Sequence, residues 1–479
     1  MIENYIEKDI IRRVKLTEYF YELKCIDIYD VSKFLKVDIL TIKRDIDFIE
    51  QIFSDAIMTI NKDKNIYTVL FKNEYGRYQL IKRIYAESKF LRVCSKYILG
   101  ERNSEIIAEE EFISLSTAFK LKREIREFLS ESIEIPKDKL IMERQDKEIR
   151  YRQALLSVWM RSDILNKGIN YDIWDKVENF VEFFLDFLTN NLSQKDTIFF
   201  KRSLYIAIVR NNYPLSIPNK DLECIKKGVI FPLLKKYLKR FFDCNLNDED
   251  VVYLTMVYRL LPYNAKNYIS LQVDHEEQRK QIFAKTNNFL ELLRFFERDF
   301  GISLIGNFGF EKAFFHLIYS AWQGLQLFSI GKHYFLNQEQ RIMKKRIKKD
   351  IKEWSHIYYN DKILASDTEI DQFCIRVTEI LISNLIPKVY LVIVAENADS
   401  HVVYREYLKK SIFNDLYSVD DVMYYSLKEL PNYYNRTGII LCERSVFLDD
   451  DVERSNIYPV SLYTLTNDMN KFFSKVFLR

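Results

Sequence analysis

Two groups of polar and basic residues near the N-terminus have the chemistry needed to bind a nucleic acid. The first group is Thr41, Lys43 and Arg44. The second group is Ser116, Thr117, Lys120, Arg123 and Arg126. Lysine and arginine neutralise phosphates and reach guanine edges, while hydroxyls and backbone amides at a helix start hold phosphates in register. These residue types therefore favour binding of double-stranded DNA.

The first group is expected on the second helix of a helix-turn-helix unit. Apolar periodicity predicts three helices and a hairpin wing, over residues 9–23, 31–35, 39–49, 57–60 and 66–71. Ile42, Ile46 and Ile49 should face the core. Asp30 and Asp38 are the expected polar N-caps of the second and third helices.

A second unit of the same kind follows. Helices are expected over residues 78–86, 89–99, 103–112 and 117–129, the third capped by Asn103 or Ser104 and the fourth by Ser116. The inward set is Ala118, Leu121, Ile125 and Leu129, and residues 133–135 and 140–142 could form a second wing. Two such units in tandem indicate DNA binding more strongly than either alone.

Overall charge gives little support, because 72 Lys and Arg against 69 Asp and Glu leave a net charge of only +3. The helix around Lys120 is locally basic, whereas Asp38, Asp45, Asp47 and Glu50 outnumber Lys43 and Arg44 on the first helix. The second unit is thus expected to bind phosphates more strongly.

The rest of the chain separates into a helical region and a small α/β region. Helices are expected over residues 171–188, 194–209, 221–242, 247–261, 276–300, 310–329, 338–354 and 367–384, with Asn170 capping the first. Strands are expected over residues 389–394, 422–426, 437–442 and 458–462, with helices over 401–413 and 467–477 and a parallel sheet. The basic run from Arg341 to Lys349 is interpreted as a solvated helix face, with DNA or partner binding as the lesser alternative.

Several classes of function lack their signatures. The first residues show no signal peptide, and no run is apolar enough to span a membrane. The six cysteines are scattered, as expected for reduced thiols in the cytoplasm, and the five histidines have no metal-ligand spacing. The loop at 395–400 has no Gly or Cys, so a phosphate-binding nest of the usual type is not expected. We expect no catalytic residues, metal or cofactor.

The order of these segments resembles the Mga/AtxA family of virulence regulators, which includes RofA-like proteins and MafR. The matching stretches are Asp30–Val37, Thr41–Ile46, Phe112–Thr117 with Lys120 and Arg123, and Asp146–Arg150. The resemblance spans essentially the whole chain. It implies a mainly α, multidomain protein: tandem winged helix-turn-helix units, two bundles similar to phosphotransferase-system regulatory domains (PRDs), and a C-terminal α/β domain similar to an EIIB component. The corresponding boundaries are 1–72, 73–148, 149–270, 271–386 and 387–479.

The resemblance also implies a function, that of a DNA-binding transcriptional regulator, usually an activator, that acts as a homodimer. In such proteins, bundle histidines are phosphorylated by HPr and other phosphotransferase-system proteins. The first bundle here has no histidine, which leaves His316 and then His356 as candidates, although His316 also suits a core position beside aromatic residues. The C-terminal domain lacks the EIIB cysteine, so its phosphotransfer activity is not expected.

Three other functions remain open at this stage. A protein–protein scaffold with degenerate DNA-binding units is the main alternative, because of the acidic first recognition helix. An RNA-binding antiterminator built on the same bundles would begin with a small β module. A phosphotransferase-system enzyme would need an active Cys or His in a phosphate loop.

Overall fold

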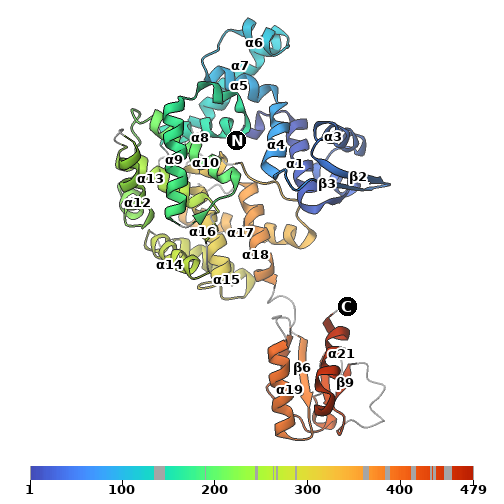
Figure 1. Cartoon of the computed structure of the whole chain (residues 1–479). Helices are drawn as coiled ribbons and strands as arrows, with labels where there is room; N and C mark the ends of the chain where they lie inside the picture. Colours follow the sequence, from blue (N-terminus) through green and yellow to red (C-terminus); the bar gives the residue numbers. More distant parts are fainter. Residues whose placement is uncertain are drawn as a thin grey trace. The chain divides into compact units, whose positions relative to one another are not determined.

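The chain is mainly helical and divides into two compact units (Figure 1). The larger unit comprises Met1–Asp299 and Ser303–Thr378, and the smaller comprises Phe300–Ile302 and Glu379–Arg479. This computed structural model describes residues 2–133, 146–188, 190–242, 246–262, 264–265, 268–285, 288–328, 330–359, 366–382, 389–411, 417–431, 434, 438–446 and 456–477.

The larger unit begins with three helices and a three-stranded sheet. Its elements are α1 (Lys8–Leu23), β1 (Cys25–Asp27), α2 (Ile28–Leu35), α3 (Ile39–Ile52), β2 (Ile57–Asp63) and β3 (Ile66–Phe71). The sheet is antiparallel with the order β1-β3-β2, and Asn61 lies opposite Thr68 across the hairpin. Ile42, Ile46 and Ile49 are fully buried, which confirms the predicted inward face of α3.

The predicted caps of this segment are confirmed in one case and wrong in the other. Asp38 caps α3, since its Oδ1 accepts the Thr41 amide at 2.6 Å. Asp30 does not cap α2. That helix begins at Ile28, because the Asp27 carboxylate accepts the amides of Tyr29 and Asp30 and so starts the helix earlier.

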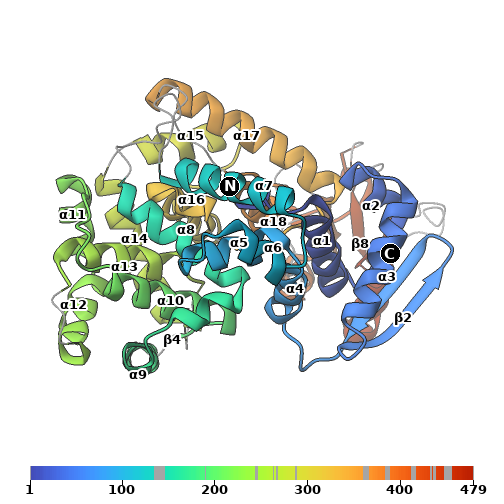
Figure 2. The same cartoon turned by 90° about the horizontal axis from the view of Figure 1, so that it is seen from above.

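Four further helices follow within the same unit: α4 (Arg77–Ala86), α5 (Lys89–Ile98), α6 (Ser104–Glu110) and α7 (Leu115–Ile133). Asn103 caps α6 by accepting the Glu105 amide at 2.9 Å. Helix α1 packs between α3 and α4 (Figure 1 and Figure 2), so it ties the first set of elements to the second. The predicted second wing, apart from Ile133, lies outside the described residues.

The helical region that follows also lies in the larger unit. Its helices are α8 (Lys147–Arg161), α9 (Tyr171–Phe187), α10 (Gln194–Val209), α11 (Asn219–Lys226), α12 (Ile230–Phe241), α13 (Asp248–Leu260), α14 (Tyr268–Lys285), α15 (Asn288–Phe300), α16 (Phe308–Ala321), η4 (Trp322–Leu327), α17 (Gln338–Tyr359) and α18 (Asp367–Ile382). Asn170 caps α9 as predicted. Helix α13 packs against both α10 and α16, and so connects the first group of these helices (α8–α13) with the second (α14–α18).

Two long helices predicted in this region are each divided. The helix expected over 221–242 is divided into α11 and α12 at Gly228. At this turn the Glu277 carboxylate of α14 accepts a hydrogen bond from the backbone amide of Val229 at 2.8 Å, which replaces the hydrogen bond that a continuous helix would make. A Cβ at Gly228 would lie 2.4 Å from Nε2 of Gln281, so the side chains of α14 approach the chain closely at this turn. The helix expected over 276–300 is divided into α14 and α15.

The smaller unit contains a parallel sheet with strand order β7-β6-β8-β9, as predicted for the α/β region. Its elements are β6 (Val389–Val394), α19 (Ala398–Ser411), β7 (Tyr417–Val419), β8 (Ile439–Glu443), β9 (Ile457–Val460) and α21 (Leu465–Phe477). The prediction of a strand over 422–426 is wrong. The chain turns after Val419 because the Asp420 carboxylate accepts the Val422 amide and the hydroxyls of Tyr424 and Tyr434.

A short segment between η4 and α17, residues 330–337, crosses to α1; we call it the strap. His333 of the strap is nearly buried, with Nδ1 at 2.7 Å from Glu18 and Nε2 at 3.2 Å from Glu3. Arg77 pairs with Glu18, and Arg161 lies 3.8 Å from Glu3. We call these five residues the ionic cluster.

Aromatic packing holds the strap against α1 and α2 as well. Phe335 lies with its ring 5.4 Å from that of Tyr19 and 4.9 Å from that of Phe34. The Arg341 guanidinium covers the rings of Phe34 and Phe335. The strap thus connects the second group of helices to α1 and α2, which both pack against α3, the helix that carries Thr41, Lys43 and Arg44.

The ionic cluster requires His333 to be charged. An ionised carboxylate only accepts hydrogen bonds, so two carboxylates facing the two ring nitrogens require both nitrogens to carry protons. Burial alone lowers the pKa of His333, but the hydrogen bonds to Glu18 and Glu3 and their negative charges outweigh it and raise the pKa to about 9. Burial raises the pKa of Glu3, but the hydrogen bond from His333 and the positive charges of His333 and Arg161 outweigh it and lower that pKa to about 2.

This raised pKa predicts a pH-dependent stability. A histidine whose pKa rises from 6.5 to about 9 on folding stabilises the fold fully below pH 6.5, and this contribution is lost as the pH rises through 9. We expect the free energy of unfolding to fall by about 3 kcal/mol over this range through His333 alone. His333→Gln should lose that part of the dependence, measured by urea unfolding at pH 6.5 and pH 9.

His356→Gln is the matched control, because it removes an exposed histidine at the end of α17. This control should keep the wild-type pH dependence. An identical pH dependence in wild type and His333→Gln would show that His333 is not charged in the folded protein.

Candidate nucleic-acid interface

The outer face of α3 presents the first predicted group. Lys43 and Arg44 are exposed, whereas Thr41 is half-buried because it completes the helix cap. The Thr41 hydroxyl donates to Asp38 at 3.0 Å in addition to its amide. These hydrogen bonds hold the pKa of the Asp38 carboxyl below its usual value. Lys43 and Arg44 are therefore the side chains of this group that are free to reach a partner.

The acidic residues of α3 have partners within the chain. Asp45 is buried, and its carboxylate accepts hydrogen bonds from both Arg12 and Arg13 of α1. Asp47 and Glu50 both pair with Lys62 of β2, at 2.9 and 2.7 Å. The acidic excess counted along the α3 sequence is thus offset by neighbouring elements, which sequence spacing on α3 alone could not indicate.

The second predicted group lies on α7. The side chains of Lys120 and Arg123 are 65% and 70% exposed, and their nearest carboxylates are 3.7 and 3.8 Å away on the same helix. Arg126 is also exposed, whereas Thr117 is half-buried. These basic side chains therefore remain available to a polyanion.

The opposite face of α7 anchors the helix. Ala118, Leu121 and Ile125 are buried as predicted. Leu129 is only half-buried, and Phe128 takes the core position instead. Lys122 points away from the exposed basic face, since its Nζ donates to Ser104 Oγ at 2.9 Å and to the Arg102 carbonyl.

The predicted role of Ser116 as the cap of α7 is wrong. The helix begins at Leu115, and Ser114 Oγ accepts the amide of Thr117 at 3.2 Å. Ser116 is exposed within the first turn, and its hydroxyl lies 2.9 Å from that of Ser114. Either serine could cap a helix by type, but only Ser114 stands three residues before an amide that it reaches.

Apolar side chains accompany the basic ones at the start of α7. Phe112, Leu115 and Phe119 are 96%, 43% and 58% exposed. Phe112 also has a positive φ of 52°, which is uncommon for a bulky residue. The surface around α7 therefore combines basic and apolar contacts.

The two histidines predicted as phosphorylation candidates lie in different environments. His316 on α16 is mostly buried, with Nε2 3.8 Å from Glu369 of α18. Burial first, and then the charges of Arg376 and Lys195, lower the pKa of His316 to about 3, so its imidazole is neutral at pH 7. His356 is exposed on α17.

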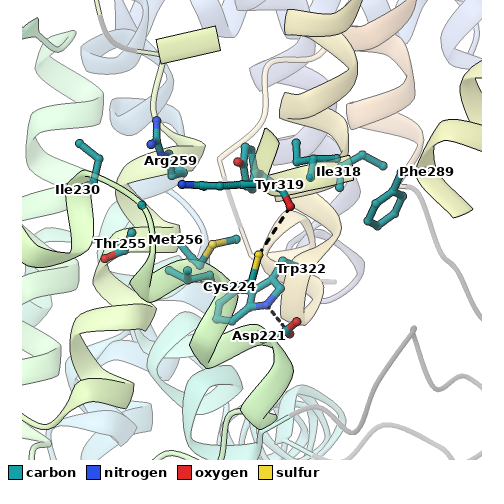
Figure 3. Close-up of a pocket in the computed structure, with 14 residues that line it drawn as sticks. Asp221, Cys224, Ile230, Thr255, Met256, Arg259, Phe289, Ile318, Tyr319 and Trp322 are labelled. Carbon is teal, nitrogen blue, oxygen red and sulfur yellow. Dashed lines mark hydrogen bonds between the residues drawn. The ribbon is translucent and has the colours of Figure 1, made fainter. Parts of the chain in front are cut away.

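Two cavities in the larger unit were not predicted from the sequence. The inter-bundle cavity, of about 70 Å³, is lined by residues of α11, α13, α14 and α16 (Figure 3). In it, Cys224 and Tyr319 point toward each other, and Trp322 Nε1 donates to Asp221 at 3.1 Å. Arg259 pairs with Asp274 and Glu277. The second cavity, which we call the junction cavity, measures about 190 Å³ and contains His316.

In the smaller unit, a carboxylate occupies the loop where a phosphate nest was not expected. Glu443, at the end of β8, accepts the amide of Glu396 at 2.8 Å and the hydroxyl of Tyr404 at 3.2 Å. The loop before α19 thus binds a negative charge that belongs to the chain itself.

Two searches for other kinds of site give nothing in the part of the chain that the structure describes. Among these residues, His, Cys, Asp and Glu form no group of three or more that could hold a metal ion. None of the described helices has the length and apolar character needed to cross a membrane.

The cap assignment on α7 can be tested by stability. Ser114→Ala should lower the free energy of unfolding by about 1 kcal/mol, because it leaves the Thr117 amide without its acceptor. Ser116→Ala is the matched control and should change it by less than roughly 0.5 kcal/mol. Urea unfolding measures both, and the reverse order would restore Ser116 as the cap.

Comparison with known proteins assigns no family to the chain. A scan against models of protein families finds no match. A search of the curated proteins likewise finds none.

Proposed function

We propose that the protein is a DNA-binding transcriptional regulator with two winged helix-turn-helix units, in which α3 and α7 enter the major groove. The observation that carries the proposal is the charge arrangement of these helices. Each presents exposed basic side chains, while Asp45 of α3 is buried against Arg12 and Arg13, and Asp47 and Glu50 share an ion pair with Lys62. A surface of this kind suits the phosphate backbone and base edges of DNA.

Each residue has a distinct part in this proposal. Lys43, Arg44, Lys120 and Arg123 bind phosphates or guanine edges, and Arg126 adds positive charge along α7. Backbone amides at the start of α7 and the exposed Ser116 hydroxyl fix the register on phosphates. The exposed Phe112 and Phe119 add apolar contacts, which fits selectivity for the shape and flexibility of A+T-rich DNA.

The remaining elements suit a regulator of the type that the sequence resembles. We propose that α8–α13 and α14–α18 are the two PRD-like bundles and that the parallel-sheet domain is EIIB-like. The regulator acts in the cytoplasm as an activator. It acts as a homodimer, because the few basic side chains of one protomer would give only modest affinity for DNA. Light scattering of the full chain measures the oligomeric state.

The rival functions each meet a specific observation. A scaffold with degenerate DNA-binding units was favoured by the acids of α3, and these are paired internally. An antiterminator would carry a small RNA-binding β module ahead of its bundles, whereas the described elements ahead of α8 are mostly helices. A phosphotransferase enzyme would need an open phosphate loop, and Glu443 occupies the one before α19.

DNA affinity should depend on α7. We expect Lys120→Ala with Arg123→Ala to weaken binding of an A+T-rich duplex at least about tenfold, because base contacts contribute about 1–3 kcal/mol each. The slope of log affinity against log salt should also fall by about two, one for each phosphate that is no longer neutralised. Gel-shift titrations at several salt concentrations measure both.

Lys345→Ala with Lys349→Ala is the matched control, since it removes two exposed charges from the basic run on α17. This control should bind DNA like the wild type. Undiminished affinity in the α7 variant would exclude α7 as the main contact, and weaker binding in the control would assign DNA binding to α17. Salt-independent or absent binding in the wild type would favour the scaffold.

Phosphorylation by the phosphotransferase system is the second part of the proposal. His316 is a neutral imidazole beside Lys195 and Arg376, an environment that can accept and stabilise a phosphoryl group. After incubation with phosphorylated HPr, mass spectrometry should find the added group on His316. His316→Ala should abolish it, while His356→Ala should not. An unmodified His316 in the wild-type protein would remove it from the proposal.

A further inference from the structure

The junction cavity lies where three parts of the larger unit meet. Its walls come from α10, α16 and α18, from the end of α13, and from the strap. Arg77 at the start of α4 also lines it. Its volume is about 190 Å³, which admits a small molecule.

Two cations from different helices, Lys195 in the lining of the cavity and Arg376 beside it, influence His316 electrostatically. Lys195 lines the cavity from the first turn of α10, and its one ion pair among the described residues is with its neighbour Asp196, at 3.2 Å. Arg376 lies on the face of α18 that also carries Glu369 and Gln372, which line the cavity. Arg376 is electrostatically coupled to Glu369 and Tyr334 but forms no direct ion pair with a described residue.

The lowered pKa of His316 agrees with positive charge around the cavity. After burial, the charges that most disfavour a protonated His316 are those of Arg376 and Lys195. Glu369 lies 3.8 Å from His316, and burial raises the pKa of its carboxyl. Three basic side chains (Arg77, Lys195 and Lys332) and two acidic ones (Asp196 and Glu369) line the cavity, so an entering anion would meet an excess of positive charge.

Polar groups beside the two cations could bind the rest of a ligand. Ser320 and Glu369 are nearly buried, and Oε2 of Glu369 has no hydrogen-bond partner among the described residues. A buried carboxyl oxygen without a partner is costly unless a donor reaches it. A ligand hydroxyl could donate a hydrogen bond to Glu369. It is uncharged, so it would not compete with an anionic group of the ligand for Lys195 and Arg376.

The inter-bundle cavity does not offer this chemistry. Its arginine, Arg259, already pairs with two carboxylates, and its volume is about 70 Å³. A ligand there would have to displace internal ion pairs, whereas Arg376 beside the junction cavity has no carboxylate in direct contact within the described part of the chain.

We propose that the junction cavity binds a small hydroxylated organic phosphate, with the dianionic phosphate between Lys195 and Arg376 and a hydroxyl on Glu369. Two cations match the charge of a phosphate dianion better than they match the charge of a ligand with a single carboxylate. The start of α10, next to Lys195, adds the positive end of a helix dipole.

Ligand binding in the junction cavity would affect the strap directly. Ile330, Gly331, Lys332 and Tyr334 line the cavity, while the intervening His333 contacts Glu18 of α1. A Cβ at Gly331 would lie 2.4 Å from Thr368 Cγ2, so the strap is closely packed against α18. A ligand bound between α10 and α18 would therefore contact the strap, which packs against α1. Only this regulatory consequence rests on the proposed DNA-binding function; the binding site does not.

Calorimetric titration of the full chain with inorganic phosphate and with 3-phosphoglycerate tests the site. We expect saturable binding of both probes, tighter for 3-phosphoglycerate. Lys195→Ala and Arg376→Ala should each weaken it at least about tenfold, as expected when a charge-assisted hydrogen bond is removed. Lys201→Ala, on the same helix but paired with Glu178 and Glu182, is the matched control and should bind like the wild type.

Three further measurements separate this site from its alternatives. Glu369→Gln should tighten binding of inorganic phosphate, because it removes a carboxylate from an anion site. His316→Gln should retain phosphate binding while losing modification by HPr, which separates a free ligand from a phosphohistidine. Hydrogen exchange in the strap should slow when 3-phosphoglycerate binds.

Several results would overturn the proposal. These are no saturable heat with either probe, equal affinity for glycerate and 3-phosphoglycerate, or undiminished binding in the Lys195 and Arg376 variants. Unchanged exchange in the strap would remove the regulatory link. A protein that binds phosphate but not DNA would overturn the proposed function alone, and one that binds DNA but not phosphate would overturn this inference alone.

Discussion

The arrangement of the larger unit depends on two carboxylates that face one imidazole, the fully buried Glu18 and the half-buried Glu3. Such charges are costly to bury unless each is paired and hydrogen-bonded. His333 meets both requirements only when doubly protonated, and Arg77 and Arg161 supply the remaining positive charge. Because His333 comes from the strap and Glu18 from α1, this pairing makes the placement of the N-terminal helices dependent on the second group of bundle helices.

This dependence gives the two halves of the larger unit a direct mechanical connection. One side of the strap faces the junction cavity and the other faces α1 and α2. The strap is therefore a packed path from α10, α16 and α18 to α1 and α2, which in turn pack against α3. In the proposed regulator, the chemistry sensed near His316 and the contacts made by Lys43 and Arg44 would share one physical link.

The elements that sequence reasoning placed correctly are those determined by neighbouring residues. Ile42, Ile46 and Ile49 follow helical periodicity, and Asp38 reaches an amide only three residues away. The ionic cluster could not be found this way, because Glu18 and His333 are 315 residues apart and neither stands in a motif. The break at Gly228 likewise depends on Glu277, which lies on another helix. At α7, two nearby serines were equally suitable by type, and only the position of Ser114 Oγ decides between them.

The Glu443 carboxylate also has a kinetic consequence for the smaller unit. A group attached to the chain is present at its binding position at an effective concentration of about millimolar or more, whatever the solution contains. A free anion must therefore compete with a ligand that cannot diffuse away from the Glu396 amide and the Tyr404 hydroxyl. An anion can therefore bind the loop before α19 only by displacing a carboxylate of the chain itself, which lowers its apparent affinity there.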